Sequence, residues 1–567
     1  MINQELSEMF LDIADILEIE GVQWEPRAYR KAALTLSTLS TDVKEIYLQG
    51  KLQDLEGIGP SIGKSIAEFI DTSHMKKYED LKKKYPIDLR TFRKIQGLGP
   101  KRAFVLYKRL KVRDLAGLRD AISRHKIREL DGFGEKSEEQ LSHSVESFMK
   151  VKEERKMLGY VLPYFEELID SLRNSGLFDS VAMAGSSRRM RETVGDLDIL
   201  ATSSNPRKGM DYFTKLKQVK EVIVNGDTKT SVKLDIGINC DIRIVEDKSL
   251  GAAMQYFTGN KDHNVKLRKI AISKGLKLNE YGVFKGDRRI AGATEKEVYA
   301  TLGLSDMPPE MRENMGEIEA SQRGRLPVPV EYEEVLGDLH IHTKDSDGTN
   351  SLEEMVDAAK NYGLKFIAVT NHSKSLPVAR GLDANRFTAF NKKVNALNEK
   401  EGGFVLKGVE LEILKDGSLD LSRPCLKEMD FVIGAMHQHT NGDRKALTER
   451  LLKAINSGMI NTVAHPTGRM IGQRAPFNLD YQRVYEACVK NDVLLEIDGY
   501  PDRSDLPFDM VKQAKEYGVK FSLGSDSHRK NQLRFIRLAT AIARRGWLEK
   551  SDVVNTLKYK DVLKLKR

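Results

Sequence analysis

The stretch GDLHIHTKDSDG, residues 337–348, decides the fold of the C-terminal part of the chain. His340 and His342 are two residues apart after an apolar run, so on a strand both imidazoles point to one face. Asp347 follows in a polar turn, and the helix-compatible stretch SLEEMVDAAKNYG comes next. This order predicts a βα unit whose functional side chains lie at the carboxyl end of its strand.

The same order recurs towards the C-terminus. Apolar runs such as FIAVTNHS and INTVAHP end in a histidine or a carboxylate and are followed by helix-compatible stretches. In barrels and doubly wound sheets of this kind, active sites lie at the carboxyl ends of the strands. The further candidates at such ends are His372, Glu410, His437, His465, Asp526 and His528.

Imidazoles and carboxylates without cysteine suit zinc, manganese or iron in a hydrolytic role. One such histidine alone is more often a hydrogen-bonded core or loop residue, but nine candidates at equivalent strand ends favour a multinuclear metal centre. The three cysteines, Cys240, Cys425 and Cys488, have no paired spacing and indicate a reducing compartment.

These residues resemble the PHP (polymerase and histidinol phosphatase) family over residues 337–567. The resemblance implies a distorted (β/α) barrel that holds three divalent metals, Zn²⁺, Mn²⁺ or iron, with Glu410 as a bridging catalytic ligand. His439 lies just outside this pattern, and we interpret it as a loop histidine in a position to touch substrate. The implied ligands are His340, His342, Glu410 and Asp526 for the first metal, Glu410, His437 and His465 for the second, and Asp347, His372 and His528 for the third.

An internal repeat organises the first 150 residues. LEGIGPSIGKSIAEFI, IQGLGPKRAFVLYKRL and LDGFGEKSEEQLSHSV begin at Leu55, Ile95 and Leu130. Each has two glycines that allow a tight turn with exposed amides at a helix N-terminus, which is a phosphate-binding device. The repeats look like helix-hairpin-helix elements, which contact the DNA backbone without reading its sequence. The predicted contacts are Gly57, Gly59, Gly97, Gly99, Gly132 and Gly134.

A second chemical centre is predicted in VAMAGSSRRMRETVGDLDIL, residues 181–200. Asp196 and Asp198 alternate on a predicted strand, and INCDIRIV adds Asp241 on another. Three carboxylates on adjacent strands can hold two Mg²⁺ or Mn²⁺ ions for in-line phosphoryl transfer. Acidic pairs on strands are usually only solvated, but here GSSRR precedes the pair. Gly185, Ser186, Arg188 and Arg189 in that segment would supply amides and cations to a triphosphate.

This arrangement resembles the nucleotidyltransferase palm of the family X DNA polymerases, an α+β domain followed by a thumb. GAAMQYFTGNKDHNVKLRKIA, residues 251–271, is similar to the dNTP-binding segment of that family, although Asn260 stands where the family commonly has serine. Taken singly, its aromatics would be core residues. The resemblance implies contacts to the dNTP or template from Arg155, Tyr256, Phe257, Gly259, Asn264 and Arg268.

The N-terminal segment also resembles the small N-terminal domain of family X. Tyr29 and Arg30 match family positions that imply DNA or 5′-phosphate binding. The family lysine that forms a Schiff base with an abasic sugar is Ser65 here, with Lys64 one residue earlier. One residue on a helix rotates a side chain by about 100°, so lyase activity is left open.

Composition agrees with a nucleic-acid partner. The 567 residues include 92 Lys and Arg against 83 Asp and Glu, a net charge of +9 that favours a polyanion. No apolar run of membrane-spanning length occurs, and MINQELSEMF does not resemble a signal peptide, so a cytoplasmic chain is expected.

Together the two resemblances, in this order, are typical of bacterial and archaeal family X DNA polymerases. We expect a monomer that fills short gaps with dNTPs in DNA repair and a C-terminal 3′-5′ exonuclease or 3′-end phosphoesterase acting on single-stranded 3′ ends. Two rivals remain: a DNA-end-binding phosphoesterase with an inactive palm, and a small-molecule phosphatase tethered to DNA. The predicted domains are 1–90 (all-α, lyase-like), 91–148 (helix-hairpin-helix), 149–245 (palm), 246–318 (thumb), 319–336 (linker) and 337–567 (PHP).

Overall fold

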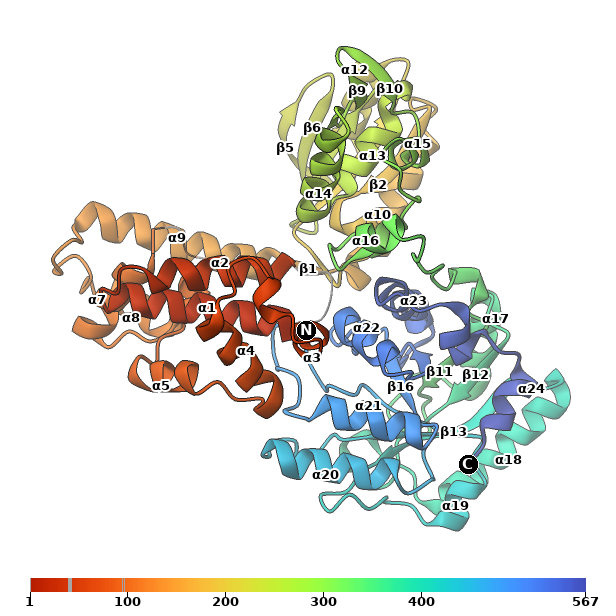
Figure 1. Ribbon diagram of the computed structural model, residues 1–567. Coiled ribbons are helices and arrows are strands. Elements are labelled where there is room, and N and C mark those ends of the chain that lie inside the picture. Colours follow the sequence, from red (N-terminus) through yellow and green to blue (C-terminus); the bar gives the residue numbers. More distant parts are fainter. Residues whose placement is uncertain (1, 39–42, 94, 96) are drawn as a thin grey trace. The chain divides into compact units, whose positions relative to one another are not determined.

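The computed structural model of the chain describes residues 2–38, 43–93, 95 and 97–567 (Figure 1). The chain divides into two compact units, Met1–Arg155 and Lys156–Arg567. Of the helices in the described residues, none combines the length and apolar character that a membrane crossing requires.

The first unit is helical throughout its described residues, as predicted. Its side chains form two hydrophobic cores, one containing Phe10 and Ile66 and the other Phe92 and Leu106. The helices are α1 (Ile2–Ile19), α2 (Glu25–Thr38), α3 (Val43–Leu48), α4 (Pro60–Thr72), α5 (Lys76–Lys84), α6 (Leu89–Phe92), α7 (Pro100–Leu110), α8 (Leu115–Ser123) and α9 (Glu135–Glu154).

Three glycine turns shape this unit. The first glycine of each turn has a positive φ, which a residue with a side chain rarely adopts: 81° at Gly57, 83° at Gly97 and 82° at Gly132. The second glycine of each turn immediately precedes α4, α7 or α9. Each helix therefore starts directly after a turn, with its first backbone N–H groups lacking a partner inside the helix. The first residue of α4 and of α7 is a proline, which has no N–H, so their donors begin one residue later.

The second unit begins with the predicted palm. Its five-stranded sheet has the order β2-β4-β7-β6-β5, in which β4 and β7 are parallel and the other pairs are antiparallel. The elements are β1 (Lys156–Met157), α10 (Leu158–Arg173), β2 (Ser180–Ala184), α11 (Gly185–Arg188), β3 (Thr193–Val194), β4 (Asp196–Thr202), α12 (Pro206–Phe213), β5 (Val219–Asn225), β6 (Lys229–Leu234) and β7 (Asn239–Ile244).

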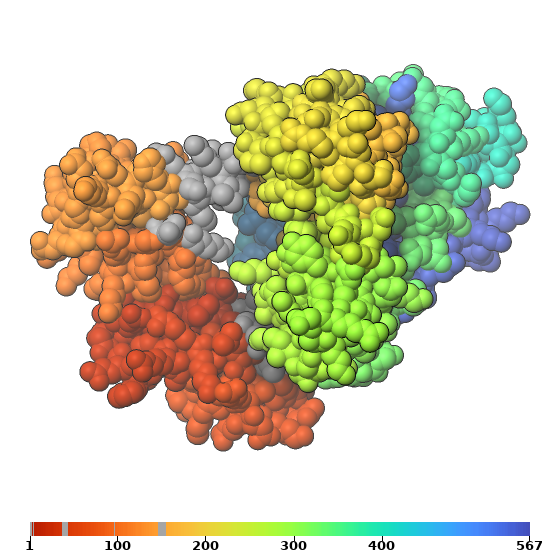
Figure 2. All heavy atoms as spheres, turned by 90° about the horizontal axis from the view of Figure 1, so that it is seen from above, coloured from red at the N-terminus to blue at the C-terminus, as the bar shows by residue number. Residues whose placement is uncertain are grey.

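The predicted thumb adjoins the palm, and Figure 2 shows palm residues in yellow beside thumb residues in green. A small sheet of order β10-β9-β8 packs with helices around Leu267 and Val298. The elements are α13 (Leu250–Thr258), α14 (Lys261–Ser273), β8 (Lys277–Asn279), β9 (Gly282–Lys285), β10 (Arg288–Ala291), α15 (Glu295–Thr301) and α16 (Glu317–Gln322).

The rest of the chain forms a seven-stranded, all-parallel sheet whose strands follow sequence order from β11 to β17. An isolated bridge between Ile341 and Ser527 joins the two ends of this sheet. The strands are β11 (Gly337–Ile341), β12 (Phe366–Val369), β13 (Val405–Glu412), β14 (Phe431–Ala435), β15 (Thr462–Val463), β16 (Leu494–Asp498) and β17 (Phe521–Gly524). This nearly closed barrel confirms the predicted PHP-type fold.

Helices alternate with the barrel strands and cover them. The stretch predicted to be helical after β11 is α17, which begins with a capping box between Ser351 and Glu354. The helices are α17 (Leu352–Tyr362), α18 (Ala384–Glu401), α19 (Arg423–Lys427), α20 (Arg444–Ile455), α21 (Tyr481–Lys490), α22 (Phe508–Glu516), α23 (Ile536–Arg545) and α24 (Tyr559–Val562).

Short 3₁₀ turns complete the chain. They are η1 (Leu52–Asp54), η2 (Asp247–Ser249), η3 (Pro309–Met311), η4 (Tyr332–Glu334), η5 (Pro377–Ala379), η6 (Lys530–Phe535), η7 (Lys550–Asp552), η8 (Val554–Thr556) and η9 (Leu563–Leu565).

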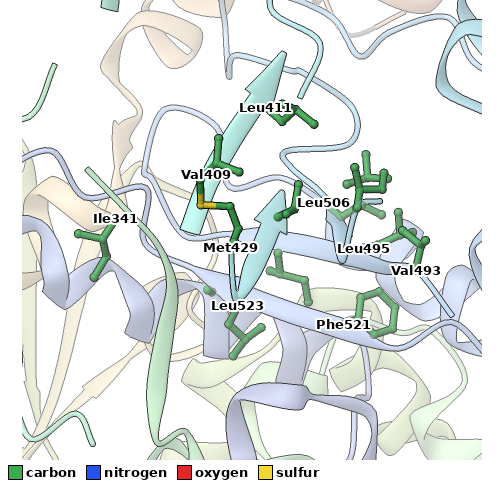
Figure 3. Packing of buried hydrophobic residues seen from close by; sticks show 14 of the residues in the cluster. Ile341, Val409, Leu411, Met429, Val493, Leu495, Leu506, Phe521 and Leu523 are labelled. Atoms are coloured by element: carbon green, nitrogen blue, oxygen red, sulfur yellow. The ribbon is translucent and has the colours of Figure 1, made fainter. Parts of the chain in front are cut away.

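Buried apolar side chains between the strands and helices hold the barrel together. Val409 of β13, Leu495 of β16 and Phe521 of β17 belong to one large cluster, part of which Figure 3 shows. The strand β12 is buried at all four of its residues, as expected for a parallel sheet covered on both faces. The core therefore fixes the strand ends from which the candidate ligands project.

Two features join the palm to the barrel. Val330, in the segment predicted to be a linker, is fully buried in the barrel core. Phe535 of η6 and Leu538 of α23 share a hydrophobic cluster with Phe165 of the palm helix α10. Within the second unit, the two modules are therefore packed on a common apolar core.

Candidate metal centres and polymerase site

The nine candidate ligands of the barrel lie at or just after the carboxyl ends of its strands. His340 and Glu410 belong to β11 and β13 themselves. The others follow a strand within a few residues, with the single exception of Asp347, which lies in the turn after β11. Those within a few residues after a strand are His342, His372, His437, His465, Asp526 and His528.

Glu410 lies at the centre of this group. Its Oε1 is 2.8 Å from His465 Nε2 and 3.1 Å from His437 Nε2. Its Oε2 is buried and makes no hydrogen bond, although three imidazole nitrogens surround it. A buried carboxylate oxygen in that environment fits a metal cation, which would provide the missing partner. The surrounding atoms are His340 Nε2 and His342 Nε2, both at 3.4 Å, and His372 Nδ1 at 2.9 Å.

The ligands form three overlapping sets, in each of which one atom per residue lies within 4.8 Å of all the others. The expected assignment gave His342 only to the first metal and His372 only to the third, whereas both residues take part in two sets. His465 joins the group through Glu410. The sets are His340, His342 and Asp526; His372, Glu410 and His437; and His342, Asp347, His372 and His528.

Two buried glutamates that the sequence analysis missed orient these histidines. Glu496 of β16 accepts a hydrogen bond from His340 Nδ1 at 2.6 Å, and Glu412 of β13 accepts one from His437 Nδ1 at 2.7 Å. Each bond leaves the Nε2 atom of its histidine facing Glu410. Carboxylates commonly hold metal-binding histidines in this way. The signal for Glu412 was its place two residues after Glu410 on one strand.

Two of the candidate ligands have pKa values that suit metal binding. Burial, together with neighbouring His528 and His372, lowers the pKa of His342 to about 3, so its imidazole is neutral at physiological pH. A neutral imidazole is the form that binds a metal. Burial alone would raise the pKa of Asp347, but hydrogen bonds from His372 and His528 lower it, so it is an ionised ligand.

His439 is exposed beside the centre. It lines a hollow of about 310 Å³ together with Lys415, Gln438 and the buried guanidinium of Arg450. Glu412 also lines this hollow. The histidine is therefore accessible to a ligand in this hollow.

In the palm, the sheet register brings two predicted carboxylates face to face. Asp198 of β4 pairs with Asp241 of β7, and Asp196 lies two residues earlier on the same strand. Burial, and then the charges of Asp196 and Asp241, raise the pKa of Asp198 to about 6. Lys229 Nζ lies 2.7 Å from Asp241 Oδ2. Among the described residues, these three carboxylates do not form a set as tight as those of the barrel.

The arginines expected to meet a triphosphate join the palm to the thumb. Arg188 donates two hydrogen bonds to Glu295, at 2.9 and 2.6 Å. Arg189 donates to Glu313 at 3.0 Å and to the carbonyl of Thr258. In this arrangement the Arg189 side chain is only 13% exposed. Gly185 and Ser186 lie at the start of α11, directly before these arginines.

The segment predicted to bind dNTP is held by contacts among its own residues. The rings of Tyr256 and Phe257 are half-buried and lie 5.1 Å apart in an edge-to-face arrangement. Asn264 is buried and donates to the carbonyl of Tyr256 at 2.7 Å. Asn260, the departure from the family pattern, caps α14. Arg268 is half-buried on α14, Gly259 ends α13, and Arg155 is exposed before β1.

The structure corrects one assignment in the N-terminal unit. Tyr29 is only 2% exposed and packs against Phe10, so it is a core residue and not a DNA contact. A neighbour in sequence, Arg30, is partly exposed but pairs with Asp15 and Glu18. Ser65 is buried on α4.

Four protein families match parts of the chain. Residues 1–75 match the helix-hairpin-helix domain family, 89–142 the SAM-like helix-hairpin-helix tandem, 253–313 the DNA polymerase beta thumb, and 338–498 the PHP domain. The DNA polymerase/3'-5' exonuclease PolX of Bacillus subtilis (strain 168) is 35% identical over 99% of both chains. The chain belongs to the PolX family.

Other relatives match one part of this PolX chain. DNA polymerase lambda of Rattus norvegicus is 22% identical over 55% of the chain and 56% of its own length. A probable phosphatase of Thermoanaerobacter sp. (strain X514) is 31% identical over 41% of the chain and 95% of its own length. The chain is therefore a family X DNA polymerase with a PHP domain. These domains imply that it uses divalent metals and binds DNA and dNTPs.

Proposed function

We propose that this polymerase fills short gaps during DNA repair and that its PHP domain removes nucleotides or blocking groups from 3′ ends. The observation that carries the proposal is the presence of two separate carboxylate-rich centres in one chain. Asp198 and Asp241 face each other in the palm, whereas Glu410 lies among the barrel histidines. The name of the Bacillus subtilis relative, a polymerase and 3'-5' exonuclease, supports the same pairing of activities.

In the palm, Asp196, Asp198 and Asp241 would hold two Mg²⁺ or Mn²⁺ ions. Bound there, such ions neutralise charge on the phosphates and the leaving pyrophosphate. The carboxylate of Asp241 is the proposed acceptor of the primer 3′-hydroxyl proton. In the structure it pairs with Lys229, whose ammonium group would have to move away first. Tyr256 and Phe257 would contact the sugar. Cations and amides for the triphosphate are assigned to Arg155, Gly185, Ser186, Arg189 and Gly259. Asn264 would contact the minor-groove edge of the incoming base, and Arg268 the template side.

In the PHP domain, the proposed ligands hold three divalent metals, with zinc, manganese and iron all compatible with imidazole and carboxylate donors. Bound metals would supply a hydroxide nucleophile and hold phosphate oxygens. Glu410 would be shared between two of these metals, because its two oxygens face different histidines. Glu412 and Glu496 keep two of those histidines oriented. The substrate class is the 3′-terminal phosphodiester or 3′ phosphate of single-stranded DNA.

The domain limits predicted from the sequence remain part of this proposal, with the PHP domain extended towards the N-terminus to include Val330. DNA contacts by the hairpin glycines and a monomeric state are also part of the proposal. The three hairpins support non-specific contact with the DNA backbone, because each presents helix amides after a glycine turn.

A gapped-DNA assay tests the proposal. The double variant Asp196→Ala, Asp198→Ala should lose nucleotide addition while 3′ processing of single-stranded DNA stays within a few fold. Equal loss of both activities would refute two independent centres. If the unchanged chain adds no nucleotide but still processes 3′ ends, it is a DNA-end phosphoesterase with an inactive palm. A preference for histidinol phosphate over DNA would instead indicate a small-molecule phosphatase.

A further inference from the structure

The loop after β16, residues 499–507, lies between the PHP centre and the palm. On its barrel side, Arg503 Nε is 3.7 Å from Oδ2 of the candidate ligand Asp526. On its palm side, the hydroxyl of Tyr160 in α10 donates to Asp502 at 2.6 Å. The contact is close: a β-carbon on Gly159 would lie 2.4 Å from Pro501 Cγ. Movement of this loop would therefore change contacts in both the palm and the PHP centre.

Arg469 is hydrogen-bonded to the backbone of this loop. It lies four residues after the candidate ligand His465, and its side chain is 16% exposed. Its Nε donates to the carbonyl of Arg503 at 2.8 Å, and its Nη2 donates to the carbonyl of Ser504. A planar guanidinium can meet two consecutive carbonyls at once, whereas a lysine ammonium on a flexible stem cannot reproduce that fork.

Arg469 forms an ion pair with Glu192, a residue of the palm. Its Nη2 lies 3.6 Å from Oε1 of Glu192, four residues before Asp196 in the palm. The other oxygen of Glu192 is 2.9 Å from Nη1 of Arg545, which is fully buried in α23. Burial alone would raise the pKa of Glu192, but Arg545, Arg191 and Arg469 lower it to about 2, so the carboxylate stays charged.

We propose that Glu192 of the palm is a positioning residue for the PHP metal centre. It holds the guanidinium of Arg469, Arg469 holds the backbone at residues 503–504, and that backbone sets the Arg503 side chain against Asp526. The proposal rests on the proposed 3′-processing activity. Residues that support a metal ligand from outside its coordination shell must be held accurately for full activity.

A second ion pair between the palm and the barrel provides a control. It distinguishes positioning of the loop from general attachment of the two modules. Arg537 of α23 pairs with Glu166 of the palm helix α10. Neither residue has a hydrogen bond or ion pair with the 499–507 loop among the contacts of the described residues. Glu166→Gln therefore removes a palm–barrel ion pair without touching the loop, and it is the matched control for Glu192→Gln.

The experiment compares the full-length chain with Glu192→Gln, Arg469→Lys and Glu166→Gln. Bound Mn²⁺ per chain, hydrogen exchange of residues 499–507, and kcat and KM on single-stranded DNA are measured. Glu192→Gln and Arg469→Lys should keep their Mn²⁺, exchange the loop amides faster, and lower kcat roughly five- to thirty-fold with KM within two-fold. Glu166→Gln should match the unchanged chain. Arg469→Lys should leave primer extension unaltered.

A double-mutant cycle completes the test. If Glu192 acts through Arg469, the double variant should be no slower than the worse single variant, and Glu192→Asp should recover part of kcat. Unchanged exchange and kcat in both single variants would overturn the proposal, as would an equal loss in Glu166→Gln. If the unchanged chain processes no 3′ ends, the proposed function fails, but loop exchange still tests the coupling by itself.

Discussion

Gly185 lies so close to Asp198 that a β-carbon at residue 185 would be 2.2 Å from Oδ2 of that carboxylate. Gly185 also has a φ of 63°, which a residue with a side chain rarely adopts. Gly185, the first residue of α11, therefore has no room for a side chain beside the carboxylate of Asp198.

Gly185→Ala should consequently abolish nucleotide addition, because the new methyl group displaces Asp198 from its place opposite Asp241. We expect primer extension on gapped DNA to fall at least about 100-fold, since small misplacements of reacting groups have effects of that size. Removal of 3′ nucleotides should persist. Gly237→Ala is the control, because Gly237 has a φ of 81° but no atom within 4 Å of its added β-carbon. Similar losses in both variants would contradict the steric argument.

Glu410→Ala should remove both bound metal and 3′ processing, because Glu410 faces histidines through both carboxylate oxygens. Glu412→Gln should lower metal affinity or activity by only about 10- to 100-fold, since Glu412 acts through His437. His528→Ala should be less damaging than Glu410→Ala. Metal content and exonuclease rate are measured together. Full metal content in Glu410→Ala would refute the bridging role, and primer extension checks that the palm is intact.

Glu295 should stabilise the palm–thumb contact in a pH-dependent way. Burial alone would raise its pKa, but Arg188 and Arg312 lower it to about 2 from 4.5, worth roughly 3 kcal/mol in the free energy of unfolding at neutral pH. Because the folded-state pKa is depressed, this stabilisation is complete above pH 4.5 and is lost as the pH falls towards 2. Glu295→Gln should lower the unfolding temperature at pH 7.

The difference in unfolding temperature between the unchanged chain and Glu295→Gln should shrink between pH 5 and pH 3. Glu297→Gln, on the exposed side of the same helix, should give a small difference that does not follow this trend. A gap that stays constant with falling pH would show that the ionised Glu295 is not the source of the stability.

The hairpin glycines Gly59, Gly99 and Gly134 have no atom within 4 Å of an added β-carbon and no positive φ. Changing all three to alanine should therefore introduce no steric clash into the folded chain. Binding of gapped DNA should weaken, because the new side chains obstruct the approach of a phosphate to the helix amides. Titrations at several salt concentrations should also show a smaller salt dependence, since fewer counterions are released. Unaltered affinity and salt slope would contradict the assigned contact.

Local patterning along the chain was sufficient to predict the barrel strands and to place the candidate ligands at their ends. Alternation of side chains on a strand and the βα order are properties of neighbouring residues. The glycine turns of the hairpins could also be predicted from the sequence. A tight turn constrains only a few consecutive dihedral angles, so its signal lies in neighbouring residues. The full-length similarity to the PolX relative confirms the family that those motifs indicated.

Only the tertiary structure decided how distant side chains meet. Tyr29 matched a binding motif but is buried against Phe10, because helix packing and not the motif sets its exposure. Glu496 lies 156 residues from His340, yet its carboxylate orients that imidazole. Arg189 meets Glu313 of the thumb in the same way. Hydrogen bonds and desolvation depend on which chain segments pack together, so contacts between segments far apart in sequence have no local signature.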